Sequence, residues 1–206
     1  MRHPDAVGAL ATLALVSLLP ALPGAAPRCR EPHYRWTQKI DTSLANLPPD
    51  SASVAAILGS WAPPDIASRD RCTPRADREL RVYVVTGWVR RLEKVKEDGD
   101  WHVELTDHAD SRADSCVVVE IPAPRYGARY AVARAALDSL IRGRKVGRGG
   151  VLTRPVHAGI AGAAFFDGQH RRGGRRSDET DGGHGRCNSS VRALWEIHPV
   201  YRMIPP

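Results

Sequence analysis

The stretch CVVVEIPAPRYGARYAVARAALDSLIRG, residues 116–143, sets a strand directly before a helix. Apolar side chains alternate across 116–121, as in a strand with one face on a core, and Pro122 ends the alternation. Between 129 and 142 the apolar residues recur at helical spacing, and Gly143 is a typical residue to end a helix. The stretch therefore predicts a strand over 116–121 and a helix over 129–142.

Further strands are predicted on both sides of this pair. Residues 79–89 and 101–105 alternate as strands do, and the Asp-Gly turn within 97–100 joins them as a hairpin. Residues 156–166 and 194–203 have the same character on the C-terminal side. Three strands, one helix and two strands is the order of the five-stranded OB barrel (β-β-β-α-β-β). We therefore expect a mainly β protein with an OB-like barrel, the alternatives being another small Greek-key barrel or an open α+β sheet.

The N-terminus has the layout of a secretory signal peptide. Its apolar run, over 7–19, is too short to span a bilayer comfortably, and prolines and small residues follow it. We expect 1–26 to be removed on export to a secreted or periplasmic location, which leaves no membrane span; the alternatives are an uncleaved anchor and a buried helix. Residues 27–78 are then a Pro-rich N-terminal extension with a short helix at 53–59, and 79–206 form the OB-like domain.

Four cysteines follow this segment, and their number favours disulfides. An even count in an exported chain is typical of paired cysteines, and the spacings match no zinc-finger pattern. We therefore expect two disulfides, with three compatible pairings; the alternative is four buried thiols in a reducing compartment. The cysteines are Cys29, Cys72, Cys116 and Cys187.

The charge of the chain is concentrated in one region. The 206 residues carry 30 Lys and Arg against 23 Asp and Glu, a formal net charge of +7. This composition excludes a coiled coil, a multi-pass membrane protein and a fully disordered chain. Residues 142–192 account for the whole basic excess.

A basic loop between the last two strands can clamp phosphate groups. We therefore expect a binding module for an anionic ligand, either nucleic acid or a cell-envelope polymer. The alternative for the loop is a solvated segment without a ligand. The expected ligand-binding residues are Arg171, Arg172, Arg175 and Arg176.

Alternation also places polar side chains opposite the apolar face. His102 and Glu104 share one face of their strand, and Glu120 lies on the matching face of the next strand. Glu196 and His198 alternate in the same way on the last strand. Histidine and carboxylate side chains bind divalent metal ions and transfer protons near neutral pH. The alternative is that these residues are the solvated face of half-exposed strands.

This pattern supports a second function, a metal-dependent hydrolase such as a phosphodiesterase, with a divalent metal ion as cofactor. A third function, a structural envelope protein without a ligand, needs no site of this kind. The expected catalytic residues are His102, Glu120, Glu196 and His198. The expected metal ligands are His102, Glu120, Asp167, His170 and His198.

The turn sequence Asp98-Gly99-Asp100 resembles an Asp-Gly-Asp of the staphylococcal nuclease family, whose barrel is OB-like. In that family a carboxylate at this place helps to hold calcium. The arginine and glutamate pattern that catalyses the reaction there is not found at matching positions of this chain. A hairpin turn explains the three residues equally well.

Four segments resemble a family of uncharacterised exported bacterial proteins: DGDWHVEL at 98–105, VEIPAP at 119–124, GAAFFDGQH at 162–170 and WEIHPV at 195–200. That family typically shows D-x-D-x-H-L, E-I-P-x-P, F-F-D-x-x-H and E-I-H-P-V or E-L-H-P-V, in this order. The resemblance covers about residues 80–203 and implies a shared domain, without an established activity. Its motifs fall on His102, Glu120, Asp167, His170, Glu196 and His198.

Overall fold

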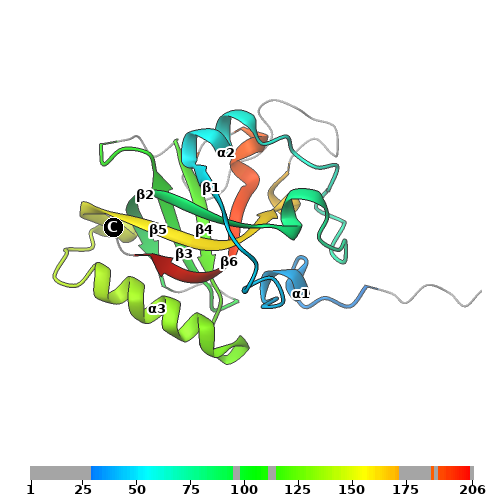
Figure 1. Cartoon of the computed structure of the whole chain (residues 1–206), viewed down its shortest axis with the longest axis horizontal. Helices are drawn as coiled ribbons and strands as arrows, with labels where there is room; N and C mark the ends of the chain where they lie inside the picture. The colour runs from blue at the N-terminus through cyan, green and yellow to red at the C-terminus, as the bar shows by residue number, and fades with distance from the viewer. Residues whose placement is uncertain (1–28, 95–97, 111–114, 172–186, 188–189, 205–206) are drawn as a thin grey trace, which may run out of the picture.

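The computed structural model describes residues 29–94, 98–110, 115–171, 187 and 190–204. These residues form a mainly β structure with one mixed sheet and few helices (Figure 1). The strands are β1 Asp50–Ser53, β2 Val82–Glu93, β3 Trp101–Thr106, β4 Cys116–Ile121, β5 Val151–Phe166 and β6 Trp195–Ile204. The α-helices are α1 Trp36–Lys39, α2 Val54–Ser60 and α3 Ala128–Leu140.

The sheet has six strands instead of the five that were expected. Their order is β1-β2-β3-β4-β6-β5, and β5 also pairs with β2. The pairs β1/β2 and β4/β6 are parallel, whereas the remaining pairs are antiparallel. The additional strand is β1, which comes from the segment expected to be an extension.

The strand and helix predicted from residues 116–143 are confirmed as β4 and α3. The main differences lie at the ends of the long strands. Residues Asp77–Leu80 form a 3-10 helix, so β2 begins only at Val82. The strand β5 begins at Val151, earlier than expected, because its first residues extend the pairing with β2 as far as Arg91.

The short helix expected at 53–59 is also confirmed, as α2. Ser53 is its N-cap, since the Ser53 Oγ accepts a hydrogen bond from the backbone N–H of Ala56 at 3.0 Å. The apolar residues Val54 and Ile57 of this helix are buried in the core. The helix therefore contributes side chains to the hydrophobic core.

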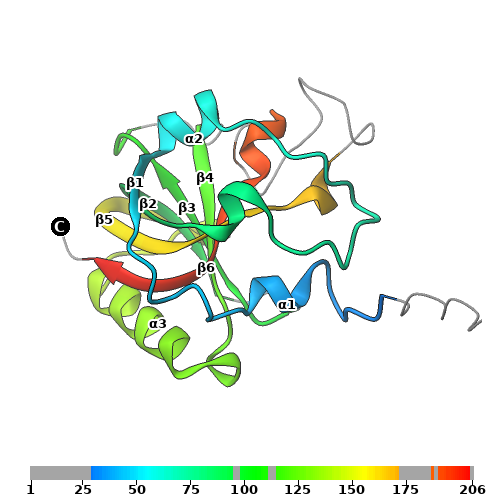
Figure 2. The same ribbon diagram turned by 45° about the vertical axis from the view of Figure 1, so that its right-hand side comes forward.

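The N-terminal segment, which was expected to be a Pro-rich extension, packs into the hydrophobic core. Tyr34, Trp36 and Trp61 are all buried. The Arg35 side chain is fully buried and forms an ion pair with Glu79, with Nη2 and Oε2 2.7 Å apart. Figure 2 shows this segment running from α1 along the sheet to α2. Aromatic packing and a buried ion pair thus attach residues before β1 to the sheet.

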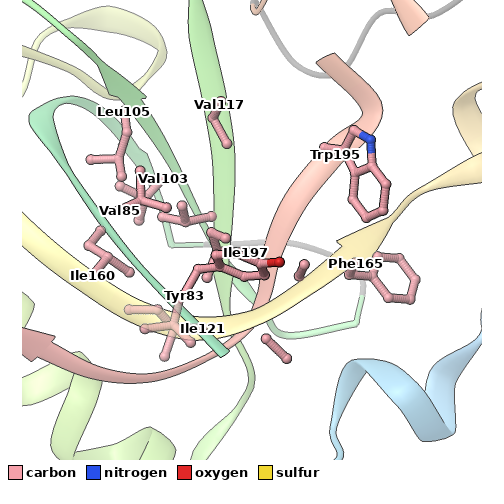
Figure 3. Packing of buried hydrophobic residues seen from close by; sticks show 14 of the residues in the cluster. Tyr83, Val85, Val103, Leu105, Val117, Ile121, Ile160, Phe165, Trp195 and Ile197 are labelled. Atoms are coloured by element: carbon pink, nitrogen blue, oxygen red, sulfur yellow. The ribbon is translucent and has the colours of Figure 1, made fainter. Parts of the chain in front are cut away.

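The hydrophobic core lies on one side of the sheet strands, where their alternating apolar side chains meet (Figure 3). The helix α3 packs against β6 and buries Tyr130, Ala133 and Leu137. The core uses one face of β3, β4 and β6, for example through Val103 and Ile197. The opposite face of these three strands is therefore left for the intervening polar residues.

Two disulfides are present, Cys29–Cys72 and Cys116–Cys187. Disulfides of this kind are typical of extracytoplasmic proteins. Within the part of the chain that the structure describes, no helix is long and apolar enough to cross a membrane. The expected signal peptide, residues 1–26, lies outside the described residues.

Candidate functional site

Five polar residues that alternation singled out are buried together on one face of β3, β4 and β6. His102 and Glu104 come from β3, Glu120 from β4, and Glu196 and His198 from β6. The antiparallel register pairs His102 directly with Glu120, and β6 runs beside β4 on its other side. The alternative of a solvated polar face is therefore wrong, because every one of these side chains is buried.

Glu120 lies between the two histidines. Its Oε1 is hydrogen-bonded to His102 Nδ1 at 2.9 Å, and its Oε2 is 3.3 Å from His198 Nδ1. Burial alone raises the pKa of Glu120, but the His102 hydrogen bond and the positive charges of His198 and Lys39 outweigh it and hold the pKa well below its ordinary value. Glu120 is therefore ionised at neutral pH.

His198 faces carboxylates with both ring nitrogens. Its Nδ1 is hydrogen-bonded to Glu196 Oε2 at 3.1 Å, and its Nε2 is 3.1 Å from Asp100 Oδ2. The imidazole packs on the ring of Phe165, with the centroids 5.6 Å apart. Burial alone lowers the pKa of His198, but the carboxylates of Asp100 and Glu196 outweigh it and raise the pKa to about 9. Without a bound metal, His198 is therefore a cation at neutral pH.

Asp100 belongs to this group although it was not among the expected site residues and entered the sequence analysis only through the Asp-Gly-Asp resemblance. It immediately precedes β3 and is fully buried. Among the described residues neither of its carboxylate oxygens meets the criteria for a hydrogen bond, although Oδ2 lies 3.1 Å from His198 Nε2. Burial raises the pKa of Asp100. The signal that could have found it is spacing, since Asp100, His102 and Glu104 share one strand face.

Glu104, at the other end of the cluster, is neutralised by an arginine. Arg91 Nη1 lies 2.7 Å from Glu104 Oε1, and Arg91 also pairs with Glu93 at 2.5 Å. The Arg91 Nε donates a hydrogen bond to the backbone oxygen of Gly149 at 2.6 Å. His102 Nε2 is 3.7 Å from the same Glu104 oxygen. The protein itself therefore compensates the charge of Glu104.

Lys39, from α1, brings a buried cation to the edge of the cluster. Its Nζ is 3.6 Å from Asp167 Oδ2, and this oxygen is 3.0 Å from His170 Nδ1. Burial alone lowers the pKa of Lys39, but the charges of Asp167, Glu196 and Glu120 outweigh it and raise the pKa. The expected metal ligands Asp167 and His170 thus pair with each other and with Lys39. Sequence patterns did not reveal Lys39, since nothing in α1 distinguishes it from a solvated lysine.

Two sets of side chains among the described residues bring three metal-ligand atoms within 4.8 Å of one another. In the first set both sulfurs belong to the Cys116–Cys187 disulfide, which leaves no thiolate to bind a metal. The second set is Asp100, Glu120 and His198, all of them buried. Only the second set therefore offers a complete group of ligand atoms.

The neighbours of this second set hold its ligand atoms in orientation. Glu196 binds His198 Nδ1, so that Nε2 is the nitrogen directed at Asp100. His102 binds one oxygen of Glu120 and leaves the other near His198. Outer hydrogen bonds of this kind fix the tautomer of a metal-binding histidine and orient ligating carboxylates. Glu196 and His102, expected as catalytic residues, occupy these supporting positions.

Arg171, an expected ligand-binding residue, is buried and engaged with the protein. Its Nη1 donates hydrogen bonds to the backbone oxygens of Pro64 at 2.8 Å and Ile66 at 3.2 Å. Its guanidinium also lies over the ring of Phe166, 5.6 Å from the centroid. These contacts make it a structural link to the N-terminal segment. The other expected ligand-binding residues lie outside the described part of the chain: Arg172, Arg175 and Arg176.

Comparisons of the chain with models of protein families, with curated proteins and with solved structures find no match. The family resemblance seen in the four sequence motifs therefore stays a prediction. The function has to be inferred from the geometry and charge of the buried cluster.

Proposed function

We propose that the protein is an exported metal-dependent hydrolase whose divalent cation is held by Asp100, Glu120 and His198. The observation that carries the proposal is the convergence of these three buried side chains, with ligand atoms within 4.8 Å of one another. Two carboxylates and one imidazole suit zinc or a similar ion, which in catalytic sites retains a further position for water. A bound ion would replace a proton that His198 otherwise carries.

The charge of the cluster supports a bound cation. The described cations close to its carboxylates are Arg91, Lys39 and Arg134. Three imidazoles also contact the carboxylates, those of His102, His170 and His198. Buried carboxylates need compensating charge because removing them from water is costly. A proton on His198 supplies part of this charge, and a divalent cation supplies more. The buried carboxylates are those of Asp100, Glu104, Glu120, Asp167 and Glu196.

A divalent cation held by Asp100, Glu120 and His198 would also supply a nucleophile, because it would lower the pKa of a bound water toward neutrality. Glu120 is the most exposed of the three ligands, with 7% of its side chain accessible to solvent. Hydrolysis of a phosphodiester would form a bond between the water oxygen and phosphorus and break the bond to one ester oxygen. The attacking water would release one proton to solvent, and the departing alkoxide would take one up.

The order of strand pairing supports an OB-like barrel as the scaffold of this site. The strands β2-β3-β4-β6-β5 pair in succession and β5 pairs back to β2, while β1 adds to β2 as a sixth strand. The helix α3 comes between β4 and β5, where the OB order has its helix. The two disulfides support export, and the apolar run at 7–19 supports a signal peptide.

Metal analysis of the purified mature protein tests the proposal. We expect one divalent ion per chain, and one site on titration with Zn²⁺ after removal of the ion by a chelator. Asp100→Asn and Glu120→Gln keep the size of the side chain but remove a charged ligand, so each should weaken zinc binding at least about tenfold. Asp41→Asn, at a half-buried carboxylate that accepts hydrogen bonds from Ser43 outside the cluster, is the matched control and should leave binding unchanged.

Two results would overturn the proposal. The metal site is excluded if the protein binds none of Zn²⁺, Mn²⁺, Co²⁺ and Ca²⁺, or if Asp100→Asn binds zinc as tightly as the natural chain. The hydrolase is excluded if the loaded protein cleaves neither bis(p-nitrophenyl) phosphate nor duplex DNA. Activity that survives Asp100→Asn would also exclude it, because the reaction would then take place elsewhere.

A further inference from the structure

A second candidate site lies on the surface, at the end of α3 and the start of β5 (Figure 1). It is a pocket of about 580 Å³. Among the described residues, no member of the buried cluster contributes to its lining. The lining residues are Leu140, Arg142, Gly143, Arg144, Lys145, Thr153 and Arg154.

The pocket is strongly basic and its charge is not neutralised. From 142 to 154 the chain carries five Arg and Lys residues and no Asp or Glu. Among the described residues, none of the four cations that line the pocket forms an ion pair with a carboxylate. Three of them, Arg142, Lys145 and Arg154, are exposed. The basic excess of the chain is therefore gathered, in large part, on one hollow surface.

The backbone that carries these cations is held in place by hydrogen bonds. Arg144 Nη1 donates to the backbone oxygen of Arg154 at 3.1 Å. Thr153 donates to the Lys145 backbone oxygen through its N–H at 3.1 Å and through Oγ1 at 3.2 Å. Gly143, with a φ of 76°, turns the chain out of α3 toward this loop. The cations are thus held on one side of a fixed turn.

Stabilisation of the α3 C-terminus accounts for only a small part of this charge. The carbonyl end of a helix carries about half a negative elementary charge, and one nearby cation offsets it. The pocket has four cations, so most of its positive charge is left to attract an external anion. No aromatic side chain is among the described residues that line the pocket, which argues against the base stacking that single-stranded nucleic acids require.

We infer that this pocket binds the phosphate groups of a linear phosphodiester polymer, through charge and without reading bases. Four cations at one surface match repeated phosphates better than a single small anion. Duplex DNA and poly(glycerol phosphate) present this chemistry, and both are suitable probes. The inference does not depend on the metal centre, so metal-free protein should bind the polymer as well as loaded protein.

The test is fluorescence anisotropy with a labelled duplex DNA and a labelled poly(glycerol phosphate), at 50 to 200 mM NaCl. The double variant Lys145→Gln/Arg154→Gln removes two exposed cations of the pocket. We expect it to weaken binding at least about tenfold and to reduce the slope of log K against log salt by about 2. The double variant Arg69→Gln/Arg192→Gln removes the same charge from exposed positions outside the pocket and should have little effect.

The two probes distinguish the sources of the phosphodiester backbone. Tighter binding of one of them, with the same loss in the pocket variant, identifies that polymer as the better ligand and supports the inference. The inference is overturned if neither probe binds at 50 mM NaCl, or if the control variant weakens binding as much as the pocket variant. It is also overturned if single-stranded DNA binds more than about tenfold tighter than duplex. Equal thermal unfolding of both variants verifies that they are folded.

Discussion

The Arg35–Glu79 ion pair joins the N-terminal segment to the sheet, and its removal should strongly destabilise the protein. The guanidinium nitrogens lie 2.8 and 2.7 Å from the two Glu79 carboxylate oxygens, and the side chains are 0% and 1% exposed. Glu79 Oε1 also accepts a hydrogen bond from the backbone N–H of Phe166 at 2.8 Å. Glu79→Gln keeps the shape of the side chain but leaves the Arg35 cation buried without its counter-ion.

Breaking a buried ion pair at one partner costs about 3–5 kcal/mol of unfolding free energy. For a chain of this length, 1 kcal/mol lowers Tm by about 2–4 °C, so Tm should fall by about 6–20 °C. The matched control is the Arg81–Asp50 pair, whose side chains are 60% and 45% exposed. Asp50→Asn should cost less than about 1 kcal/mol, because water screens an exposed pair.

Urea unfolding at pH 7 with the disulfides intact, followed by tryptophan fluorescence, measures both free energies. We expect a large shift of the Glu79→Gln midpoint, with little change in the slope of the transition. The reasoning fails if Glu79→Gln loses less than about 1 kcal/mol, or no more than Asp50→Asn does. Either result would mean that water reaches Arg35 and that other contacts hold the N-terminal segment, such as its aromatic packing and the hydrogen bonds from Arg171.

Three further predictions concern the buried cluster and its surroundings. Glu196→Gln should lower zinc affinity about 10–100-fold, because Glu196 orients His198 without being a ligand. Zinc titration measures the affinity, and an unchanged value would contradict the positioning role of Glu196. In metal-free protein the pKa of His198 is raised from 6.5 to about 9, so the protonated His198 should contribute its full stabilisation of the fold below pH 6.5. About 3 kcal/mol of this stability should be lost as the pH rises through 9. Urea unfolding from pH 6 to pH 10 measures this loss, which should be absent in His198→Gln. Replacement of Cys116 and Cys187 by Ser removes a disulfide between residues 71 apart and should lower the free energy of unfolding by about 2–5 kcal/mol. Thermal unfolding measures this loss, and a smaller one would mean that the disulfide constrains the unfolded chain little.

Several elements were predictable from the sequence because local patterns determine them. Alternation over 116–121 and helical spacing over 129–142 correctly predicted β4 and α3. The short helix at 53–59 was predictable for the same reason, since its N-cap Ser53 bonds to a backbone N–H only three residues away. The strand count was not predictable in this way, since β1 has only four residues and becomes a strand by pairing with β2.

The polar face was predictable, but its chemistry was not. Alternation placed His102 and Glu120 on matching faces, and their hydrogen bond confirms that placement. The same alternation was compatible with a solvated face, because a period of two residues distinguishes the sides of a strand and does not say what covers each side. Burial by the rest of the chain decided between these interpretations.

The sequence by itself determined the order of strands and helix, the even set of cysteines and the residue types of the polar face. The tertiary structure decided which cysteines pair, that Asp100 and Lys39 join the cluster, and that Arg171 is buried. Periodicity depends on neighbours within one element, and it is therefore written in the local sequence. A metal site or a buried ion pair depends on atoms from distant segments that lie a few ångströms apart, and only the packing of those segments fixes such distances.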